Sequence, residues 1–182
     1  IEGIPRLGVP LVRESDASLG VANQVEQRKG DVATALPSSL ATAATFDPEI
    51  ARAGGAMIGA EARAKRFNVL LAGGVNLNRD PWGGRNFEYL GEDPLLAGEL
   101  AGAHIAGVQS NRIASTIKHF ALNSQETGRM VLDARIGEAA LRESDLLAFQ
   151  IAIEKGNPAS VMCAYNKVNG DWACENDFLL NQ

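Results

Sequence analysis

The sequence lacks several features that would place it in a common functional class at once. It has no stripe of Lys and Arg: 17 basic residues are scattered among 22 acidic ones, and the net charge is −5. A chain without such a stripe cannot neutralise a row of phosphates, so we expect no nucleic-acid partner. No apolar run approaches the length that a membrane-spanning helix needs, so we expect no membrane span either.

Motifs for cofactors and metals are also missing. Gly73-Gly74 and Gly83-Gly84 fit neither a Gly-x-Gly-x-x-Gly nor a Walker pattern, so we interpret them as turn glycines. The only cysteines, Cys163 and Cys174, have no His-x-x-x-His pattern nearby and make a poor zinc site. The sequence therefore predicts no cofactor and no metal. Whether the two cysteines form a disulfide stays open.

The two ends of the sequence lack the signals of a complete protein. The first residues hold no initiator Met and no signal peptide, and the last ones open an amphipathic helix without a stop signal. We therefore expect both ends to be internal to a longer polypeptide. The composition, 46% hydrophobic and 21% charged, is typical of a globular domain.

Apolar runs alternate with helical patterns along the chain. The runs are continuous, which is typical of strands that are covered on both faces. Asp47-Pro48 and Asp93-Pro94 each place a capping carboxylate before a Pro at the first helical position, and a third helix is expected from about Glu138 to Lys155. The predicted strands are Val9–Arg13, Val69–Ala72, Ile113–Ile117 and Ser160–Ala164. This alternation predicts a parallel α/β fold.

Polar residues gather just after the carboxyl end of each predicted strand. These are Asp16, the segment 76–88, Lys118-His119 and Tyr165. Barrel enzymes build their sites from several strand ends, whereas a doubly wound sheet concentrates its site at one switch point. We therefore predict part of a TIM-like (β/α) barrel with mostly parallel strands.

Several of these polar residues have two readings. Asp16 could hold sugar hydroxyls or cap a following turn. The pairs Arg79–Asp80 and Arg85–Glu88 could be ion pairs that shape their loop, or Arg85 could offer a guanidinium fork to vicinal hydroxyls. Lys118 and His119 can both donate to a sugar.

For the polar residues inside the predicted helices, we expect structural roles only. His104 is expected to be a packed or surface histidine. The acidic residues of the third helix, including Asp145, are expected on a solvated face.

Taken in order, these segments resemble glycoside hydrolase family 3. The blocks that carry the resemblance cover nearly the whole chain and include Glu14-Ser15-Asp16, 79–88, Gly91-Glu92-Asp93-Pro94, Lys118-His119-Phe120 and 161–166. The resemblance implies that residues 1–182 are part of a single N-terminal (β/α) barrel domain, with the remaining strands and later domains outside this chain.

The resemblance also implies roles for individual residues. Asp16 matches the aspartate that holds the far hydroxyls of the terminal sugar, Met162 an apolar wall, and Tyr165 a tyrosine close to the nucleophile. The polar residues expected around the same sugar ring are Arg85, Lys118, His119 and Arg129. The family also suggests a cis peptide between Lys118 and His119, because successive strand residues otherwise point to opposite faces.

No catalytic residue is expected in this chain. In the family the nucleophile is an aspartate in a Ser-Asp-Trp block one strand later, and the acid/base carboxylate lies in a later domain. Asp171-Trp172 follows Gly170 and comes too soon after Tyr165 to be that block. Many related β-glucosidases carry an Arg six residues after the aspartate, where this sequence has Ala22, which puts strict glucose selectivity in doubt. Conversely, Asp16 rather than Glu at its position leans toward six-carbon sugars over xylose.

The resemblance thus predicts a retaining exo-β-glucosidase that removes terminal β-linked glucose, with this chain supplying the sugar-binding half of the site. The alternatives are a catalytically silent sugar-binding homologue and a β-xylosidase-like specificity. The expected partners are a β-glucoside or oligosaccharide and the remainder of the polypeptide, or a complementary fragment. A secreted or periplasmic location suits such an enzyme.

Overall fold

The computed structural model describes residues 2–23 and 26–182, and its centre is a four-stranded parallel sheet. The strands are β1 (Glu14–Asp16), β2 (Val69–Leu71), β3 (Ala114–Phe120) and β5 (Ser160–Cys163). They stand side by side in chain order, and each neighbouring pair is parallel. Because all four strands are parallel, their carboxyl ends lie at the same end of the sheet.

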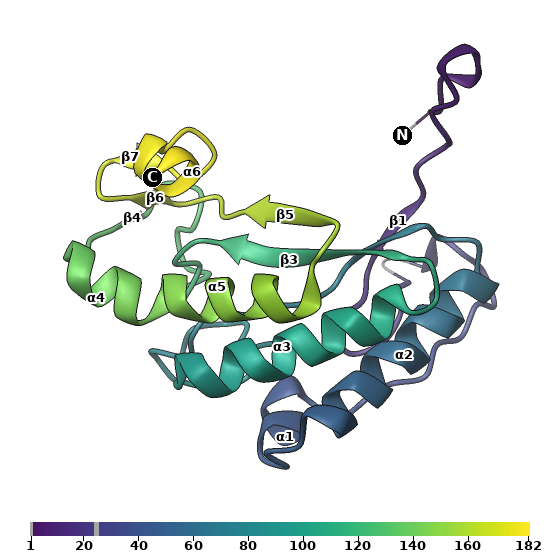
Figure 1. Cartoon of the computed structure of the whole chain (residues 1–182), viewed down its shortest axis with the longest axis horizontal. Coiled ribbons are helices and arrows are strands. Elements are labelled where there is room, and N and C mark those ends of the chain that lie inside the picture. The colour runs from purple at the N-terminus through teal and green to yellow at the C-terminus, as the bar shows by residue number, and fades with distance from the viewer. Residues whose placement is uncertain (1, 24–25) are drawn as a thin grey trace.

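The long helices lie together on one side of this sheet (Figure 1). They are α2 (Pro48–Ala64), α3 (Pro94–Gln109) and α5 (Asp145–Gly156), with the short α1 (Ser39–Ala43) and α4 (Glu138–Glu143) next to them. The short η1 (Pro5–Leu7) lies at the tip of the N-terminal arm, away from the long helices (Figure 1). A doubly wound sheet carries helices on both faces, whereas a barrel carries them only outside. The prediction of a partial (β/α) barrel is therefore confirmed. None of the helices in the described part of the chain combines the length and hydrophobicity needed to cross a membrane.

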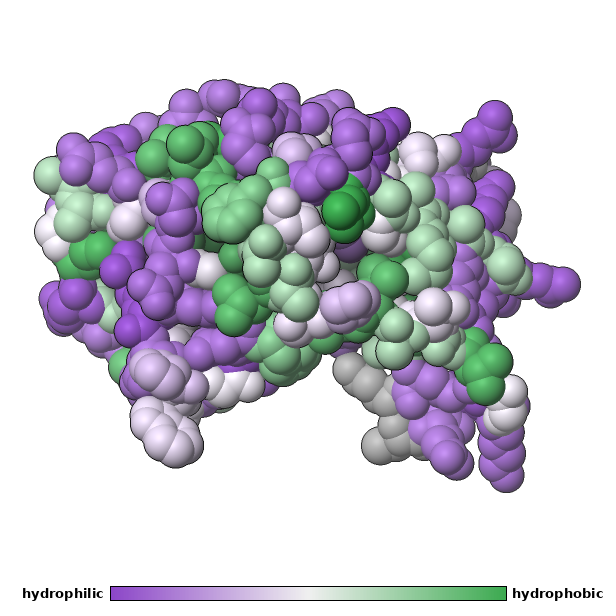
Figure 2. All heavy atoms as spheres, turned by 90° about the horizontal axis from the view of Figure 1, so that it is seen from below, coloured by the Kyte–Doolittle hydropathy of each residue, from purple (hydrophilic) through white to green (hydrophobic). Residues whose placement is uncertain are grey.

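The helix starts follow from their caps. The Asp47 carboxylate accepts the Glu49 amide at 2.8 Å, and the Asp93 carboxylate accepts the Leu96 amide at 2.7 Å. Glycines then allow α2 and α3 to pack closely: a Cβ at Gly59 would lie 2.6 Å from the Val108 carbonyl oxygen. The face seen from below in Figure 2 carries a band of apolar atoms among polar ones.

Two apolar clusters join these helices to the sheet. Ile58, Leu70 and Val108 are fully buried between α2, β2 and α3. Ile117 belongs to the second cluster, with residues of α3 and α5, and Phe149 meets the ring of Phe120 edge-on at 5.0 Å.

A second, smaller sheet combines one strand that precedes β5 in the chain with two that follow it. It is formed by β4 (Asp133–Ala134), β6 (Lys167–Val168) and β7 (Asp171–Trp172), next to α6 (Asp177–Asn181). The Cys163–Cys174 disulfide ties the end of β5 to this segment, with the two Cα atoms 5.6 Å apart. The disulfide whose presence the sequence left open is therefore formed.

The predicted strand Val9–Arg13 is wrong. The strand lies at Glu14–Asp16, where Glu14 is in register with Val69 of β2. A turn with Gly8 in the left-handed region folds Val9 back onto Ile4, and residues 10–13 form an arm that extends from the sheet (Figure 1). The apolar run misled because its side chains, such as Val9 at 44% exposure, are not in the core of this chain.

The single helix predicted from Glu138 to Lys155 is also wrong, because it breaks at Ser144. The Ser144 hydroxyl donates to the Ala140 carbonyl oxygen at 2.6 Å, a contact that bends helices. The break turns Asp145 inward, where it is 1% exposed and pairs with Arg79. Asp145 is therefore not on a solvated face, and Arg79 does not pair with Asp80.

Candidate functional site

A buried lysine links the ends of two strands that are not neighbours. The Lys118 ammonium, on β3, donates to the Asp16 carboxylate, on β1, at 3.1 Å. The lysine is 1% exposed, whereas the Asp16 side chain is 41% exposed. β2 lies between these two strands, and the segment after it contains Gly73 and Gly74, which have no side chains that could separate Lys118 from Asp16. Gly73 also has a φ of 109°, which favours glycine.

His119 is the next residue, and it is held on several sides. Its backbone N–H donates to the Asn76 side-chain oxygen at 2.8 Å, and the Asn76 amide nitrogen donates back to the His119 carbonyl at 2.9 Å. The ring nitrogen Nδ1 lies 3.2 Å from the Tyr89 hydroxyl. Burial, together with the charges of Arg85, Lys118 and Arg129, lowers the pKa of His119 to about 2, so the imidazole is neutral at physiological pH.

The backbone here departs from regular strand geometry. The Lys118–His119 peptide is cis, as predicted, and so is Phe120–Ala121. The pairing of β3 with β5 shifts between Lys118 and Phe120, which is a β-bulge. Bulges re-aim side chains at strand ends.

Arg85 lies in the loop after β2 and contacts two carboxylates. It pairs with the buried Glu88, as one reading of the sequence predicted, and its second nitrogen lies 4.0 Å from the Glu126 carboxylate. Ser18, two residues beyond Asp16, donates to Glu88 at 2.9 Å. Glu88 therefore connects the loop after β1 to the loop after β2.

The remaining predicted residues continue this network. Arg129 pairs with Glu126 at 2.8 Å, and its guanidinium lies 4.8 Å from the centre of the Tyr165 ring. Met162 is half-buried on β5, in register with Lys118. Parallel strands in register direct such side chains to the same face of the sheet.

The structure thus brings all seven predicted residues to the strand carboxyl ends. Asp16 and Lys118 form one ion pair, Arg85 and Arg129 are linked through Glu126, and Arg129 also contacts the Tyr165 ring. That they contact a sugar stays a prediction. Such a set of cations and carboxylates suits a polyhydroxylated ligand, because each hydroxyl can accept from a cation and donate to an anion.

Sequence reasoning assigned no individual role to Asn76, Tyr89 and Asn123, which are buried and support this set. Asn76 and Tyr89 contact His119, and Asn123 donates to the Tyr89 hydroxyl and to the Glu126 carboxylate. A signal was present, since Asn76 lies shortly after β2 and Gly73-Gly74, at the carboxyl end of the sheet where the site residues gather.

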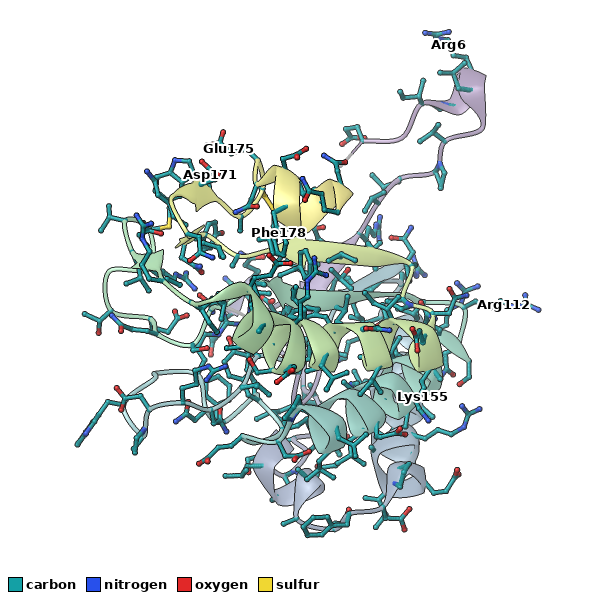
Figure 3. All side chains as sticks on the ribbon, turned by 60° about the vertical axis from the view of Figure 1, so that its left-hand side comes forward. Arg6, Arg112, Lys155, Asp171, Glu175 and Phe178 are labelled. Carbon is teal, nitrogen blue, oxygen red and sulfur yellow. A yellow bond between two sulfur atoms is a disulfide. The ribbon has the colours of Figure 1, made fainter. Side chains whose placement is uncertain are left out.

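Asp171 is placed as expected for a residue outside the site. It is exposed at the β6–β7 turn, and Figure 3 shows it with Glu175 on the outer side of the C-terminal segment.

Comparison with known proteins agrees with this geometry. The profile of the "Glycosyl hydrolase family 3 N terminal domain" matches residues 4–182. The chain belongs to glycosyl hydrolase family 3. Its resemblance to the family, predicted from the sequence, is confirmed.

Relatives in family 3 are similar over the whole chain. Beta-glucosidase B of Emericella nidulans is 48% identical over 97% of this chain, and thermostable beta-glucosidase B of Acetivibrio thermocellus is 42% identical over 98% of it. The structure of beta-glucosidase 3B from Thermotoga neapolitana in complex with glucose superposes with a TM-score of 0.92 at 42% identity, over 99% of this chain and 26% of that one. The chain spans 21% and 24% of the two curated relatives.

Proposed function

We propose that the polypeptide to which this chain belongs is a retaining exo-β-glucosidase that removes terminal β-linked glucose, and that this chain supplies the sugar-binding half of its site. The observation that carries the proposal is the Asp16–Lys118 pair at the strand ends, with His119, Arg85 and Arg129 close by. The names of the family relatives, which are β-glucosidases, support it.

In the proposed reaction this chain positions the sugar. Asp16 accepts from hydroxyls, while Lys118, Arg85 and Arg129 donate to them, and Met162 and Tyr165 bound the ring. Retention uses two carboxyl groups about 5–5.5 Å apart. One attacks the sugar and forms the covalent glycosyl-enzyme intermediate while the other protonates the leaving group, and the second group then activates the water that releases the sugar. We expect both the aspartate nucleophile and the acid/base carboxylate in the continuing polypeptide.

The test is to assay the complete polypeptide on aryl β-glucoside and aryl β-xyloside, and to follow the anomer of the first product by NMR. Release of β-glucose as the first product supports the proposal. Binding of glucose without turnover would leave a catalytically silent sugar-binding homologue, and an inverted product would contradict retention.

One observation favours keeping β-xylosidase-like specificity as a second candidate. The Ala22 backbone amide donates to the Asp16 carbonyl at 2.8 Å, so this position lies next to Asp16 in the fold, and its methyl side chain has no hydrogen-bonding group to offer a sugar hydroxyl. Arg28 donates to the Ala22 carbonyl at 2.7 Å but is also paired with Asp31 at 2.6 Å. A higher kcat/KM on the xyloside than on the glucoside would establish this second specificity.

We also propose a secreted or periplasmic location. The Cys163–Cys174 disulfide supports it, because disulfides persist in oxidising compartments. Fractionation of the producing cells, with the polypeptide detected by antibody, tests this location, and a cytosolic pool would contradict it.

A further inference from the structure

The hydrogen-bond partners of His119 determine which of its ring nitrogens carries the proton. Nδ1 lies 3.2 Å from the Tyr89 hydroxyl and 3.3 Å from the Asn76 side-chain oxygen. The Tyr89 hydroxyl accepts from the Asn123 side-chain nitrogen at 2.9 Å and lies 3.2 Å from the Asn123 carbonyl oxygen. All four residues are buried, so each donor must meet an acceptor among these neighbours.

The orientation of the Asn76 amide is decided first. Its oxygen accepts the His119 backbone N–H and its nitrogen donates to the His119 carbonyl. A flipped amide would set donor against donor and acceptor against acceptor. The atom beside Nδ1 is therefore an oxygen, which cannot donate.

The tautomer follows from this oxygen. A proton on Nδ1 can be donated to Asn76, and Tyr89 can then donate its own proton to the Asn123 carbonyl. With the proton on Nε2, a bare Nδ1 would face the Asn76 oxygen, and Tyr89 could satisfy either Nδ1 or the Asn123 carbonyl but not both. Only the first arrangement pairs Nδ1, the Tyr89 hydroxyl and the Asn123 carbonyl at the same time.

We propose that His119 is held as the neutral Nδ1–H tautomer and presents an unprotonated Nε2 as a hydrogen-bond acceptor to a sugar hydroxyl, with Asn76 and Tyr89 as its positioning residues. The part that concerns the sugar rests on the proposed function. The proposal reverses the donor role that the sequence suggested for His119.

The charges around the ring suit an acceptor. Arg85, Lys118 and Arg129 place positive charge near the imidazole and oppose its protonation. The carboxylates of Glu88, Glu126 and Asp16 are engaged by these same cations. A sugar hydroxyl that accepts a hydrogen bond from one of the cations can thus donate its proton to His119, a pairing that a protonated imidazole could not offer.

The first experiment reads the tautomer directly. The complete polypeptide is labelled with ¹⁵N-histidine, and the ring signals of His119 are assigned by their loss in His119→Gln or, if that variant does not fold, by their shift in Tyr89→Phe. We expect a protonated Nδ1 and a bare Nε2 throughout the neutral pH range. A protonated Nε2 with a bare Nδ1 would overturn the proposal.

The second experiment separates positioning from folding. Asn76→Asp sets a carboxylate against Nδ1, which raises the pKa of His119 and converts Nε2 into a donor as the pH falls. Since the wild-type pKa is about 2 and a neighbouring carboxylate raises a pKa by about 1–3, the kcat/KM of this variant relative to wild type should drop by up to about tenfold between pH 7 and pH 4. Tyr89→Phe should lower kcat/KM by about three- to tenfold.

Thr116→Val is the matched control. It removes a buried hydroxyl from the same strand, where Thr116 bonds to Ser160 at 2.6 Å and not to His119. Its kcat/KM relative to wild type should not change with pH. An equally flat ratio for Asn76→Asp would contradict the proposal, whereas a polypeptide without glycosidase activity would refute the proposed function and leave the spectrum to decide the tautomer.

Discussion

The charged residues predicted for the site are stabilised and oriented by their ion-pair partners. The Lys118 ammonium is buried and needs the Asp16 carboxylate, because an unpaired buried charge costs several kcal/mol. Arg85 and Arg129 are both oriented by Glu126, and Arg85 is held by Glu88 as well. Hydrogen-bonding groups that are already ordered before a ligand arrives reduce the entropic cost of binding it.

The Asp16 carboxylate provides the first prediction. Asp16→Asn in the complete polypeptide should lower kcat/KM on an aryl β-glucoside by about ten- to a hundredfold, because a hydrogen bond to a charged group contributes about 1.5–3 kcal/mol. Asp47→Asn, at the exposed cap of α2, is the control, since Asn caps as well as Asp. An unchanged kcat/KM in Asp16→Asn would remove Asp16 from the sugar site.

Among the secondary-structure elements, the loop after β2 depends on α5. Arg79 donates to the Asp145 carboxylate and to the Ser144 hydroxyl, the latter at 3.0 Å. The Asp145 side chain is fully buried, whereas Arg79 is 44% exposed. This pair thus anchors the loop that carries Arg85 to the start of a helix distant in the sequence.

Breaking this anchor should cost stability. In the complete polypeptide, Arg79→Ala leaves the buried Asp145 carboxylate without its cation, and we expect the free energy of unfolding to fall by about 1–3 kcal/mol, measured by thermal or denaturant unfolding. Arg135→Ala is the control, because the Arg135–Asp133 pair is exposed and should contribute less than about 1 kcal/mol. Equal losses in the two variants would show that the anchor has no special role.

His104 on α3 should make the fold sensitive to acid. Burial lowers the pKa of this half-buried residue to about 4. An unfolded histidine titrates near pH 6.5, so the unfolded state binds more protons between these values. The stabilisation is complete above about pH 6.5 and is lost as the pH falls toward 4.

His104→Gln should reduce this pH dependence, because glutamine does not titrate. Between pH 7 and pH 4 the wild type should lose up to about 3 kcal/mol more than the variant, and somewhat less if solvent screens the ring. Melting temperatures of the complete polypeptide, with and without His104→Gln, measure the difference across this range. The exposed Arg52→Gln on α2 is the control, and a wild-type slope in His104→Gln would contradict the assignment.

At the scale of the whole molecule, the sheet is open. β1 and β5 are its outer strands, and Val161 on β5 is 51% exposed. An open parallel sheet leaves backbone donors and acceptors unpaired along both edges. The candidate site lies along one end of this sheet, so its geometry depends on what pairs with the two outer strands.

Residues 1–182 expressed alone should therefore neither hydrolyse glycosides nor fold cooperatively. The carboxylates at the site, Asp16, Glu88 and Glu126, are all engaged by cations, and we expect the catalytic pair elsewhere. An aryl β-glucoside assay with circular dichroism and light scattering provides the measurement. A monomeric, cooperatively folded and active product would contradict the prediction.

Much of this architecture could be predicted from local signals. The caps at Asp47 and Asp93 mark the starts of α2 and α3, and the apolar runs at Val69, Ile113 and Ser160 lie on or beside β2, β3 and β5. The predictions for Val9–Arg13 and for an unbroken third helix were wrong. In both places a contact across the fold, with β2 or with Arg79, overrides the local pattern.

The sequence by itself determined the family, the alternation of strands and helices, and the placement of polar residues after strand ends. These properties depend on neighbours within a few positions, or on motifs that occur in order along the chain. Only the tertiary structure decided that Lys118 reaches Asp16 across 102 positions, that Asp145 is buried, and that Asn76 and Tyr89 face His119. Ion pairs and tautomers depend on distances of about 3 Å between groups far apart in sequence, which spacing along the chain cannot supply.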